Sequence, residues 1–415
     1  MSTFVRLAVR NVARNRRRSL ITLSAVLLGV TAVLVTRGIM DGFLRMVVDD
    51  VVQGRTGALQ IHPAGYMASM EALPLEPSLP YDDALLARIR SVPGVVGVSG
   101  RLIFSGLVSN GLSQTTFLGR GLDLAREKQA VPRFGIEVRA GGRVLGPGDH
   151  AQALLGSELA RSFKAVPSNQ KTEGTVDRVT LAASSPKGRA NSLDVAVEGL
   201  TESTLPFENK RVVTVPLKLA QELLGLEGRV TELAVAVEDL GELDQVAERL
   251  RAALGPAYEV HTWKDLQPFV RDILTRQKFV LALISTILFV IILTGIINTM
   301  LMSVFERVRE IGTMLAVGVR RRQVLGLFLL EAAVLGLVGG VGGVGLGAAI
   351  VGALAAQGIP MENIGTGGPV LLRPELDLPF VLMAFVVAVV GAVAAAAWPA
   401  WKASRLNPVD ALRSS

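Results

Sequence analysis

The side chains that most often do chemistry are few in this chain and stand far apart. The three histidines are His62, His150 and His261, and no cysteine is present. Zinc–thiolate sites, thiol nucleophiles and disulfides are therefore excluded, and the histidines, which show no ligand spacing, are interpreted as isolated. No G-x-x-x-x-G-K-[ST] phosphate loop occurs, and no Ser/His/Asp or paired-carboxylate arrangement stands out. We therefore expect no catalytic residue, cofactor or metal ion in this chain.

The strongest local pattern is the segment Glu306–Arg320, ERVREIGTMLAVGVR. As a helix it places Ile311, Met314 and Leu315 on one side, flanked by Glu and Arg. A short amphipathic helix suits docking into a groove of a partner protein, although a solvated connector fits the same composition. The residues predicted to make this contact are Glu306, Arg307, Arg309, Glu310, Ile311, Gly312, Met314, Leu315, Gly318 and Arg320.

Four long apolar stretches must position that segment. The first begins near Ser19, and the others are Phe279–Val304, Val324–Ala356 and Pro379–Ala400. Each has the ~18 or more apolar residues needed to cross a hydrocarbon core about 30 Å thick. The composition agrees, because 50% of the residues are hydrophobic and only 19% are charged, against about 25% charged residues in soluble proteins.

The arginines predict which side each part occupies. Arginines crowd before the first stretch and between the second and third, whereas the short loop before the fourth has only Arg373. Positive residues concentrate in cytoplasmic flanks, so both termini should be cytoplasmic and the large domain periplasmic. This distribution also argues against nucleic acid as the reason for the net charge of +7. A cleaved signal peptide is the alternative for the first stretch, but no A-x-A-like site follows it.

The sequence thus predicts an α-helical membrane protein with four transmembrane helices and a large α+β periplasmic domain inserted between the first and second. The predicted segments are a cytoplasmic amphipathic helix (1–18), transmembrane helix one (19–40), the periplasmic domain with helical stalk ends (41–278), transmembrane helix two (279–304), a cytoplasmic coupling helix (305–323), transmembrane helix three (324–356), a short periplasmic loop (357–378), transmembrane helix four (379–400) and a cytoplasmic tail (401–415).

Within the large domain, strand and helix patterns alternate, which is typical of an α+β fold. Residues of about 123–205 differ, and we interpret them as a second, strand-rich lobe inserted into the first. Two β-like segments of this lobe flank a polar tip, which we expect either to contact a periplasmic partner or to be an ordinary mobile hairpin. The tip residues are Ser184, Ser185, Pro186, Lys187, Gly188 and Arg189.

Polar and small residues inside the spans carry further expectations. Asn298 should hydrogen-bond between helices, and Glu331 should pair with a nearby cytoplasmic arginine, because polar groups in a bilayer seek partners. The third span is rich in glycine at G-x-x-x-G spacing, for example Gly339, Gly343 and Gly347, which lets helix backbones approach closely. Packing within the chain is favoured over a dimer contact.

Several motifs resemble the permeases of the MacB/LolC/LolE/FtsX superfamily of ABC transporters. SVFERVREIGTMLAVGVRRRQVLGLFLLEAAVLGLVGG is similar to their segment after the second span, and LAVRNVARNRRRSLIT and WPAWKASRLNPVDALR are similar to their two ends. TGALQIHPAGY, LLGSELARSF and VHTWKDLQPFV resemble parts of their periplasmic domain. KAVPSNQKTEGTVDRVTL departs from the pattern, because family members often have a short glycine turn there.

The resemblance implies a non-catalytic permease subunit of the bacterial inner membrane that relays ATPase-driven motion to its periplasmic domain. It implies a second permease as partner, in a homo- or heterodimer, and an ABC ATPase that holds ATP and Mg²⁺ and docks on the Glu306–Arg320 segment. MacB carries its ATPase ahead of the first span, so we expect the ATPase to be a separate polypeptide here. The domain is larger than in FtsX proteins, and the LolC/LolE lipoprotein-release branch is the closest fit.

That branch predicts lipoprotein cargo, a periplasmic carrier, and an apolar wall at the outer ends of the first two spans. The predicted wall residues, which could instead face lipid or pack within one subunit, are Val30, Leu34, Ile39, Val280, Leu281 and Ile284. The alternatives are a MacB-like efflux permease for peptides or drugs and a signalling permease that controls a periplasmic hydrolase or sensor. An independent secondary transporter is disfavoured, because no internal repeats are found.

Overall fold

A computed structural model of the chain describes residues 3–14, 16–135, 137–139, 141–203, 206–362 and 369–405. The chain divides into two compact units. We call the first the helical unit (Met1–Arg45, Ile273–Pro360 and Leu371–Ser415) and the second the sheet unit (Met46–Asp272 and Met361–Val370).

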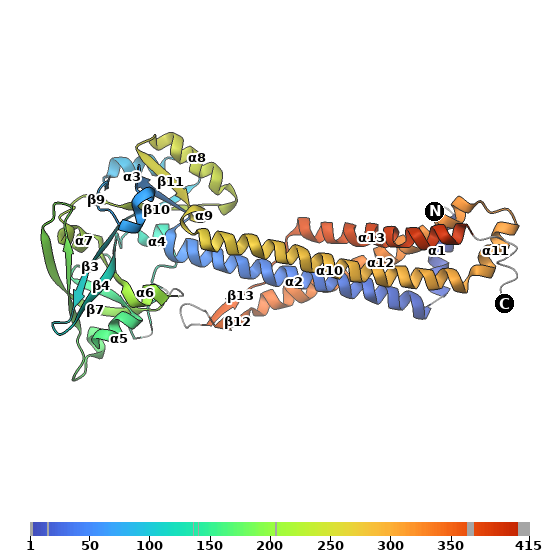
Figure 1. Cartoon of the computed structure of the whole chain (residues 1–415), viewed down its shortest axis with the longest axis horizontal. Coiled ribbons are helices and arrows are strands. Elements are labelled where there is room, and N and C mark those ends of the chain that lie inside the picture. The colour runs from blue at the N-terminus through green and yellow to red at the C-terminus, as the bar shows by residue number, and fades with distance from the viewer. Residues whose placement is uncertain are drawn as a thin grey trace. The chain divides into compact units, whose positions relative to one another are not determined.

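The helical unit contains the predicted spans (Figure 1). Among the described residues, four helical stretches are long and apolar enough to cross a membrane, namely Ser19–Thr56, Pro268–Glu306, Arg321–Gln357 and Leu378–Ser404. The helices of this unit are α1 (Thr3–Arg14), α2 (Arg16–Val51), α10 (Pro268–Glu306), α11 (Val308–Ala316), α12 (Arg321–Gln357) and α13 (Leu378–Ser404). At 36 and 39 residues, α2 and α10 exceed the ~20 residues that a span needs, as the predicted stalk ends require.

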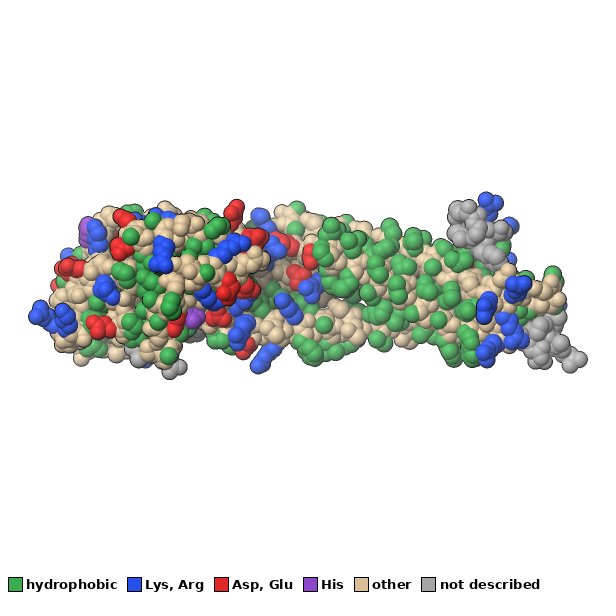
Figure 2. All heavy atoms as spheres, turned by 90° about the horizontal axis from the view of Figure 1, so that it is seen from above, with side chains coloured by type: hydrophobic (Ala, Val, Ile, Leu, Met, Phe, Trp, Pro, Cys, Tyr) green, Lys and Arg blue, Asp and Glu red, His purple; other side chains and the backbone are tan. Residues whose placement is uncertain are grey.

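Glycines of α12 allow two neighbouring helices to pack closely against it. A Cβ added to Gly339, Gly343 or Gly347 would lie within 3.0 Å of a side chain of α2. A Cβ at Gly336 would lie 2.8 Å from Ala392 of α13. The stripe therefore serves packing within the chain, which confirms that prediction. The charges agree with a membrane location, since Figure 2 shows hydrophobic side chains along the unit and Lys and Arg gathered at one end of it.

The sheet unit is built on one nine-stranded sheet in the order β11-β1-β10-β3-β4-β8-β5-β7-β6. Its strands are β1 (Leu59–Pro63), β3 (Val95–Ser109), β4 (Gln114–Leu122), β5 (Gln152–Gly156), β6 (Arg178–Ser184), β7 (Ala190–Thr201), β8 (Val212–Pro216), β10 (Glu232–Val237) and β11 (Tyr258–Thr262). The short elements are η1 (Val52–Thr56), η2 (Met67–Ala72), η3 (Ser168–Gln170), η4 (Leu240–Glu242), β2 (Leu79–Pro80) paired with β9 (Arg229–Val230), and β12 (Ile359–Glu362) paired with β13 (Pro369–Leu372).

Helices cover parts of this sheet, as expected for an α+β domain. They are α3 (Asp83–Arg90), α4 (Glu127–Ala130), α5 (Ser157–Phe163), α6 (Pro206–Arg211), α7 (Leu217–Leu224), α8 (Leu243–Leu254) and α9 (Trp263–Leu266). In α8 the buried side chains Leu243, Val246, Ala247, Leu250 and Leu254 recur at helical spacing, so one apolar stripe of that helix packs on the core.

Six of the strands, β3 to β8, close into a ring, and this pairing corrects the prediction of a separate inserted lobe. β3 is 15 residues long, and it pairs with β10 and β4 and also, near its end, with β6, where Leu107 faces Ala182. Together with the pairs β4–β8, β8–β5, β5–β7 and β7–β6, this makes a closed ring of six strands. The strands of residues 123–205 thus belong to the main sheet, and the prediction of a separate inserted lobe was wrong.

Candidate functional site

The predicted coupling helix exists as α11, which lies between the end of α10 and the start of α12. Gly318 follows it with a φ of +100°, a conformation that glycine adopts without strain. Arg320 then caps α12, and its backbone N–H donates a hydrogen bond to Gln323 Oε1 at 2.9 Å. The helix is therefore shorter than the predicted range of 305–323, because both flanks belong to turns or to neighbouring helices.

The apolar face of α11 packs inside its own chain. Ile311 is fully buried in a cluster with Val304, Val324, Phe328 and Ala400, and Met314 and Leu315 pack against the same cluster. We predicted that this face would enter a partner's groove, and that was wrong for Ile311, whereas Met314 and Leu315 are half-buried. The reason is that the helix folds back over the cytoplasmic ends of α10, α12 and α13, whose apolar side chains it shields from water.

The opposite face of α11 and its flanks are exposed. Val317, in the turn after α11, is 87% exposed. The other exposed residues of α11 and its flanks include Glu306, Arg309, Glu310, Ala316, Gly318 and Arg320, whereas Arg307 and Gly312 are buried. The exposed positions thus combine the apolar Val317 with charged side chains.

A polar network ties α11 to α1 and α12. Arg307 Nη1 donates to Glu331 at 3.0 Å, and both side chains are largely buried, with 8% and 6% exposed. Asn11 of α1 also donates to Glu331, at 2.6 Å. Arg307 and Arg14 in turn contact Glu310, at 3.1 and 2.7 Å. The predicted pairing of Glu331 with a cytoplasmic arginine is confirmed.

The pKa values of Arg307, which precedes α11, and of Glu310 within it follow from this network. Burial lowers the pKa of Arg307, but the carboxylates of Glu331 and Glu310 outweigh that effect, and the pKa is raised overall. Burial raises the pKa of Glu310, but hydrogen bonding to Arg307 and the charge of Arg14 outweigh it, and the pKa is lowered. Both groups are therefore charged at neutral pH, and the network is a set of ion pairs.

The predicted apolar wall is not one surface. Val30, Leu34 and Leu281 are buried in the helical unit, because α2 and α10 pack against their neighbours through these side chains. Only Val280 and Ile284 are exposed, and Ile39 is half-buried. Asn298 is likewise exposed on α10 rather than directed to a neighbouring helix of the chain, contrary to expectation.

A second group of ion pairs lies where α2 ends in the sheet unit. The π-helical turn η1 closes that helix and carries Arg55. Arg55 contacts Glu208 of α6 at 3.1 Å and Glu137 at 3.5 Å, and Glu208 also pairs with Arg120 of β4 at 2.5 Å. Burial raises the pKa of Glu208, but Arg120 and Arg55 outweigh it, and the pKa is lowered.

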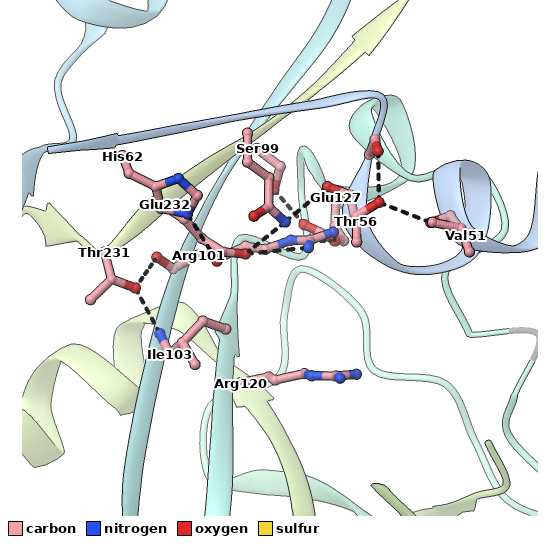
Figure 3. A network of polar contacts seen from close by, with 12 residues as sticks. Val51, Thr56, His62, Ser99, Arg101, Ile103, Arg120, Glu127, Thr231 and Glu232 are labelled. Atoms are coloured by element: carbon pink, nitrogen blue, oxygen red, sulfur yellow. Dashed lines mark hydrogen bonds and ion pairs between the residues drawn. The ribbon is translucent and has the colours of Figure 1, made fainter. Parts of the chain in front are cut away.

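The next residue, Thr56, begins a buried network that reaches the sheet (Figure 3). Its carbonyl accepts a hydrogen bond from Gln60 of β1 at 3.1 Å, and Gln60 also donates to Glu232 of β10. Glu232 pairs with Arg101 of β3 at 3.4 Å, and Arg101 pairs with Glu127 of α4 at 2.5 Å. Burial raises the pKa of Glu232, but contacts with His62 and Arg101 outweigh it, and the pKa is lowered.

The histidines are less isolated than the spacing suggested. The ring of His62 is buried, stacks on Tyr66 at 4.8 Å and lies 5.7 Å from the ring of His261. They are brought together because β1 and β11 are paired strands. No group of three or more metal-ligating side chains occurs among the described residues, so this arrangement offers no metal site there.

The predicted tip joins β6 to β7 as an ordered turn. Ser185 N donates to Arg189 O at 2.8 Å, and Gly188 N donates to Ser185 O at 2.9 Å. Lys187, Gly188 and Arg189 are exposed, as is Ser184, and Ser185 and Pro186 are half-buried. The tip thus presents two cations on a defined turn.

Sequence reasoning missed the ionic groups at the end of α2. Arg55 and Glu208 are 153 residues apart, and neither stands in a recognisable motif. The available signal was a charged residue at the end of a helix that was already predicted to leave the membrane. Its partners become apparent only when the sheet is folded.

The fold defines a protein with four candidate membrane spans and a separate sheet domain. Residues 19–253 match the MacB-like periplasmic core domain, and residues 282–408 match the FtsX-like permease C-terminal family. The first match covers more than half of the chain, so this chain belongs to the MacB/FtsX family of ABC transporter permeases. It is a multi-pass protein of the inner membrane, and its sheet unit is periplasmic.

Individual relatives are similar over most of the chain. Macrolide export ATP-binding/permease protein MacB 2 of Aeromonas hydrophila is 26% identical over 98% of this chain and 60% of its own length. MacB of Sodalis glossinidius is 27% identical with the same coverage. The probable syringafactin export ATP-binding/permease protein SyfD of Pseudomonas syringae is 26% identical over 96% of this chain and 57% of its own length. The chain thus spans about 60% of the length of these curated relatives.

Proposed function

We propose that this chain is the permease of a MacB-type exporter, in which a separate ABC ATPase binds the cytoplasmic side and drives movement of the periplasmic domain. The observation that carries the proposal is the match of residues 19–253 to the MacB-like periplasmic core domain. Relatives named for macrolide and syringafactin export favour export of a drug-like or peptide-like compound. They favour this reading over release of lipoproteins, which has no such support.

In this proposal the ATPase contacts the outer face of α11. Because Ile311 fixes the inner face of that helix to the bundle, the exposed positions, among them Arg309, Glu310 and Val317, remain for a partner. A force on that surface would be passed to α12 through the buried Arg307–Glu331 pair and to α1 through Asn11 and Arg14. Because α11 is attached to α12 and α1 by these contacts, it can transmit a movement of the ATPase to the membrane helices.

At the periplasmic side, the same proposal assigns the relay to the end of α2. Arg55 and Thr56 connect its last turn to β1, β4 and α6 through hydrogen bonds and ion pairs. A rotation or shift of α2 would therefore act on strands of the sheet unit instead of being lost in a loose linker.

The test replaces Val317 by Asp in the full-length chain, purified from its own host through an affinity tag. We expect loss of the co-purifying ABC ATPase and of export, because a charge is placed at the exposed apolar position of the proposed contact. Val317→Ala, which keeps the surface apolar, is the matched control. Equal recovery of the ATPase with both variants would contradict this docking surface, and the absence of any ATPase with the unaltered chain would contradict the exporter itself.

The ordered tip, Ser184–Arg189, is proposed as the contact for a periplasmic partner. Lys187 and Arg189 are exposed there on a fixed turn, which suits an acidic partner surface. Replacing the tip with Gly and Ser should leave the ATPase bound and impair only delivery beyond the inner membrane. Normal delivery by that variant would reject the contact.

A further inference from the structure

A cavity of about 100 Å³ lies among three helices of the helical unit. Its lining comes from α2, α10 and α13, and every lining side chain except Ser285 is apolar. Val30, Ile292 and Ala388 form its buried floor, whereas Met383, which is 54% exposed, stands at its rim. The cavity therefore opens toward the medium that surrounds the helices.

The lining residues place the cavity between the outer side of the membrane and about its middle. Phe380, one of its wall residues, is in the first turn of α13, which begins at the periplasmic side. Ala388 is eight residues further on, about 12 Å at 1.5 Å per residue. The hydrocarbon core is about 30 Å thick, so the floor reaches about its midplane, in agreement with Val30 and Ile292, which lie near the middle of the predicted spans 19–40 and 279–304.

The occupant that this environment supplies is hydrocarbon. An apolar cavity does not hold water, and one of about 150 Å³ binds benzene, so the present volume suits a short run of methylene groups. In a bilayer the exposed Met383 would bring the rim into contact with lipid tails. An empty cavity would forfeit dispersion contacts along its whole lining, and an acyl chain that enters it restores them.

One cation stands beside the cavity at its outer end. Arg37 of α2 lies with Cζ 5.0 Å from the centre of the Phe380 ring, and its Nε donates to Asp41 at 2.7 Å. A guanidinium has five N–H donors in a fork that matches phosphate, so this group can bind an anion while it stays paired. Arg37 is four residues beyond Val33 of the lining, about 6 Å closer to the outer surface.

We propose that this cavity binds one acyl chain of an outer-leaflet phospholipid, with Arg37 donating hydrogen bonds to the phosphate of the same molecule. The fit of the site to a lipid rests on its depth, its apolar lining and the charge at its outer end. Lipid binding at this site requires no transport cycle. The lipid proposal can therefore be tested independently of the exporter proposal.

The experiment is native mass spectrometry of the full-length chain, released from nanodiscs that contain equal amounts of phosphatidylethanolamine and diacylglycerol. The unaltered chain should retain one phospholipid. Ala384→Leu and Ser285→Leu fill the cavity from opposite walls, and each should lose that adduct. Ala394→Leu, the same change at an exposed position of α13 outside the lining, should keep it. Size-exclusion chromatography verifies that each variant is folded.

The role of Arg37 is tested in the same mixture. Arg37→Gln should retain diacylglycerol about as readily as phospholipid, because only the phosphate contact is removed. Arg45→Gln is the matched control, since Arg45 is also on α2 and pairs with Glu375 at 2.8 Å; it should keep the preference for phospholipid. The proposal is overturned if the unaltered chain retains no phospholipid, if the filled variants retain as much, or if Arg37→Gln leaves the preference unchanged.

Discussion

Glu331 brings a carboxylate to the buried, cytoplasmic end of α12, where Arg307 and Asn11 satisfy it. The two charges lie among apolar side chains, for Arg307 also stacks over the Phe328 ring at 5.6 Å. Such a pair contributes little net stability compared with apolar residues of similar size, but either partner left alone is strongly destabilising. The pair thus fixes how α11 attaches to the bundle.

Replacing Glu331 by Gln should lower the free energy of unfolding by up to about 3–5 kcal/mol, because Arg307 keeps its buried charge with only Glu310 as a carboxylate partner. Breaking the exposed Arg14–Glu310 pair with Arg14→Met should cost less than about 1 kcal/mol. The double variant Arg307→Met/Glu331→Leu should recover most of the loss. Denaturant titration in detergent micelles measures all three, and equal stability of Glu331→Gln and Arg14→Met would contradict the structural role of the buried pair.

Glu232 makes the sheet unit sensitive to acid. Its pKa in the folded protein lies below the ordinary value of 4.5, so its stabilising contribution is present above that value and disappears as the pH falls through the lowered folded pKa. We expect Glu232→Gln to unfold at a lower temperature at neutral pH and to show a weaker loss of stability in acid than the unaltered chain.

The buried Trp263 of α9 can report this unfolding after Trp398 and Trp401 are replaced by Phe. The surface residue Glu248, which is 73% exposed, provides the control Glu248→Gln, whose unfolding should follow the unaltered chain at every pH. Parallel curves for Glu232→Gln and the unaltered chain would show that this carboxylate does not govern the acid response.

Among the membrane helices, α12 relies on the absence of side chains at several positions. A Cβ on Gly343 would lie 2.7 Å from the Cβ of Val30 and 2.8 Å from the carbonyl oxygen of Leu27. A Cβ on Gly345, two residues further along the same helix, would meet no heavy atom of the described residues within 4 Å. The two positions thus form a matched pair for testing the contact between α12 and α2.

Gly343→Ala should destabilise the helical unit by about 1–3 kcal/mol, because α12 and α2 must move apart. Gly345→Ala should be neutral or stabilise by up to about 1 kcal/mol, since alanine is the better helix former. Thermal unfolding of the two variants in detergent makes the comparison. If both changes had the same effect, helix propensity and not close packing would explain the glycine stripe.

Most helices and strands could be predicted from the sequence, but which elements pack or pair with one another could not. Length and hydropathy suffice for the four spans, and the spacing of Ile311, Met314 and Leu315 suffices for a helix. What covers that face depends on Phe328 and Ala400, which are distant in sequence and reach it only in the folded bundle. Likewise, the strand pattern of residues 123–205 contains no signal for the pairing of β6 with β3, and a separate lobe was the simpler interpretation.

In the whole molecule, transmission to the periplasmic domain should depend on Arg55. In Arg55→Met, Glu208 and Glu137 lose their shared cation, and we expect export to fall while the partner ATPase continues to bind and hydrolyse ATP. Arg139→Met, which breaks a surface pair with Glu202, is the control and should export normally. The ratio of export to hydrolysis in proteoliposomes is the measurement, and an unchanged ratio in Arg55→Met would remove this residue from the relay.

The pairing of β1 with two late strands has a consequence for how the protein is made. β1 follows directly after α2, yet its neighbours in the sheet are β10 and β11, and β11 ends at Thr262, only six residues before α10 begins at Pro268. During synthesis the first strand to reach the periplasm must therefore wait, unpaired on both sides, for almost the whole domain to be translocated. Its completion coincides with the arrival of the second span at the translocation machinery, so that chaperone protection of β1 and timely insertion of α10 become parts of one biogenesis step.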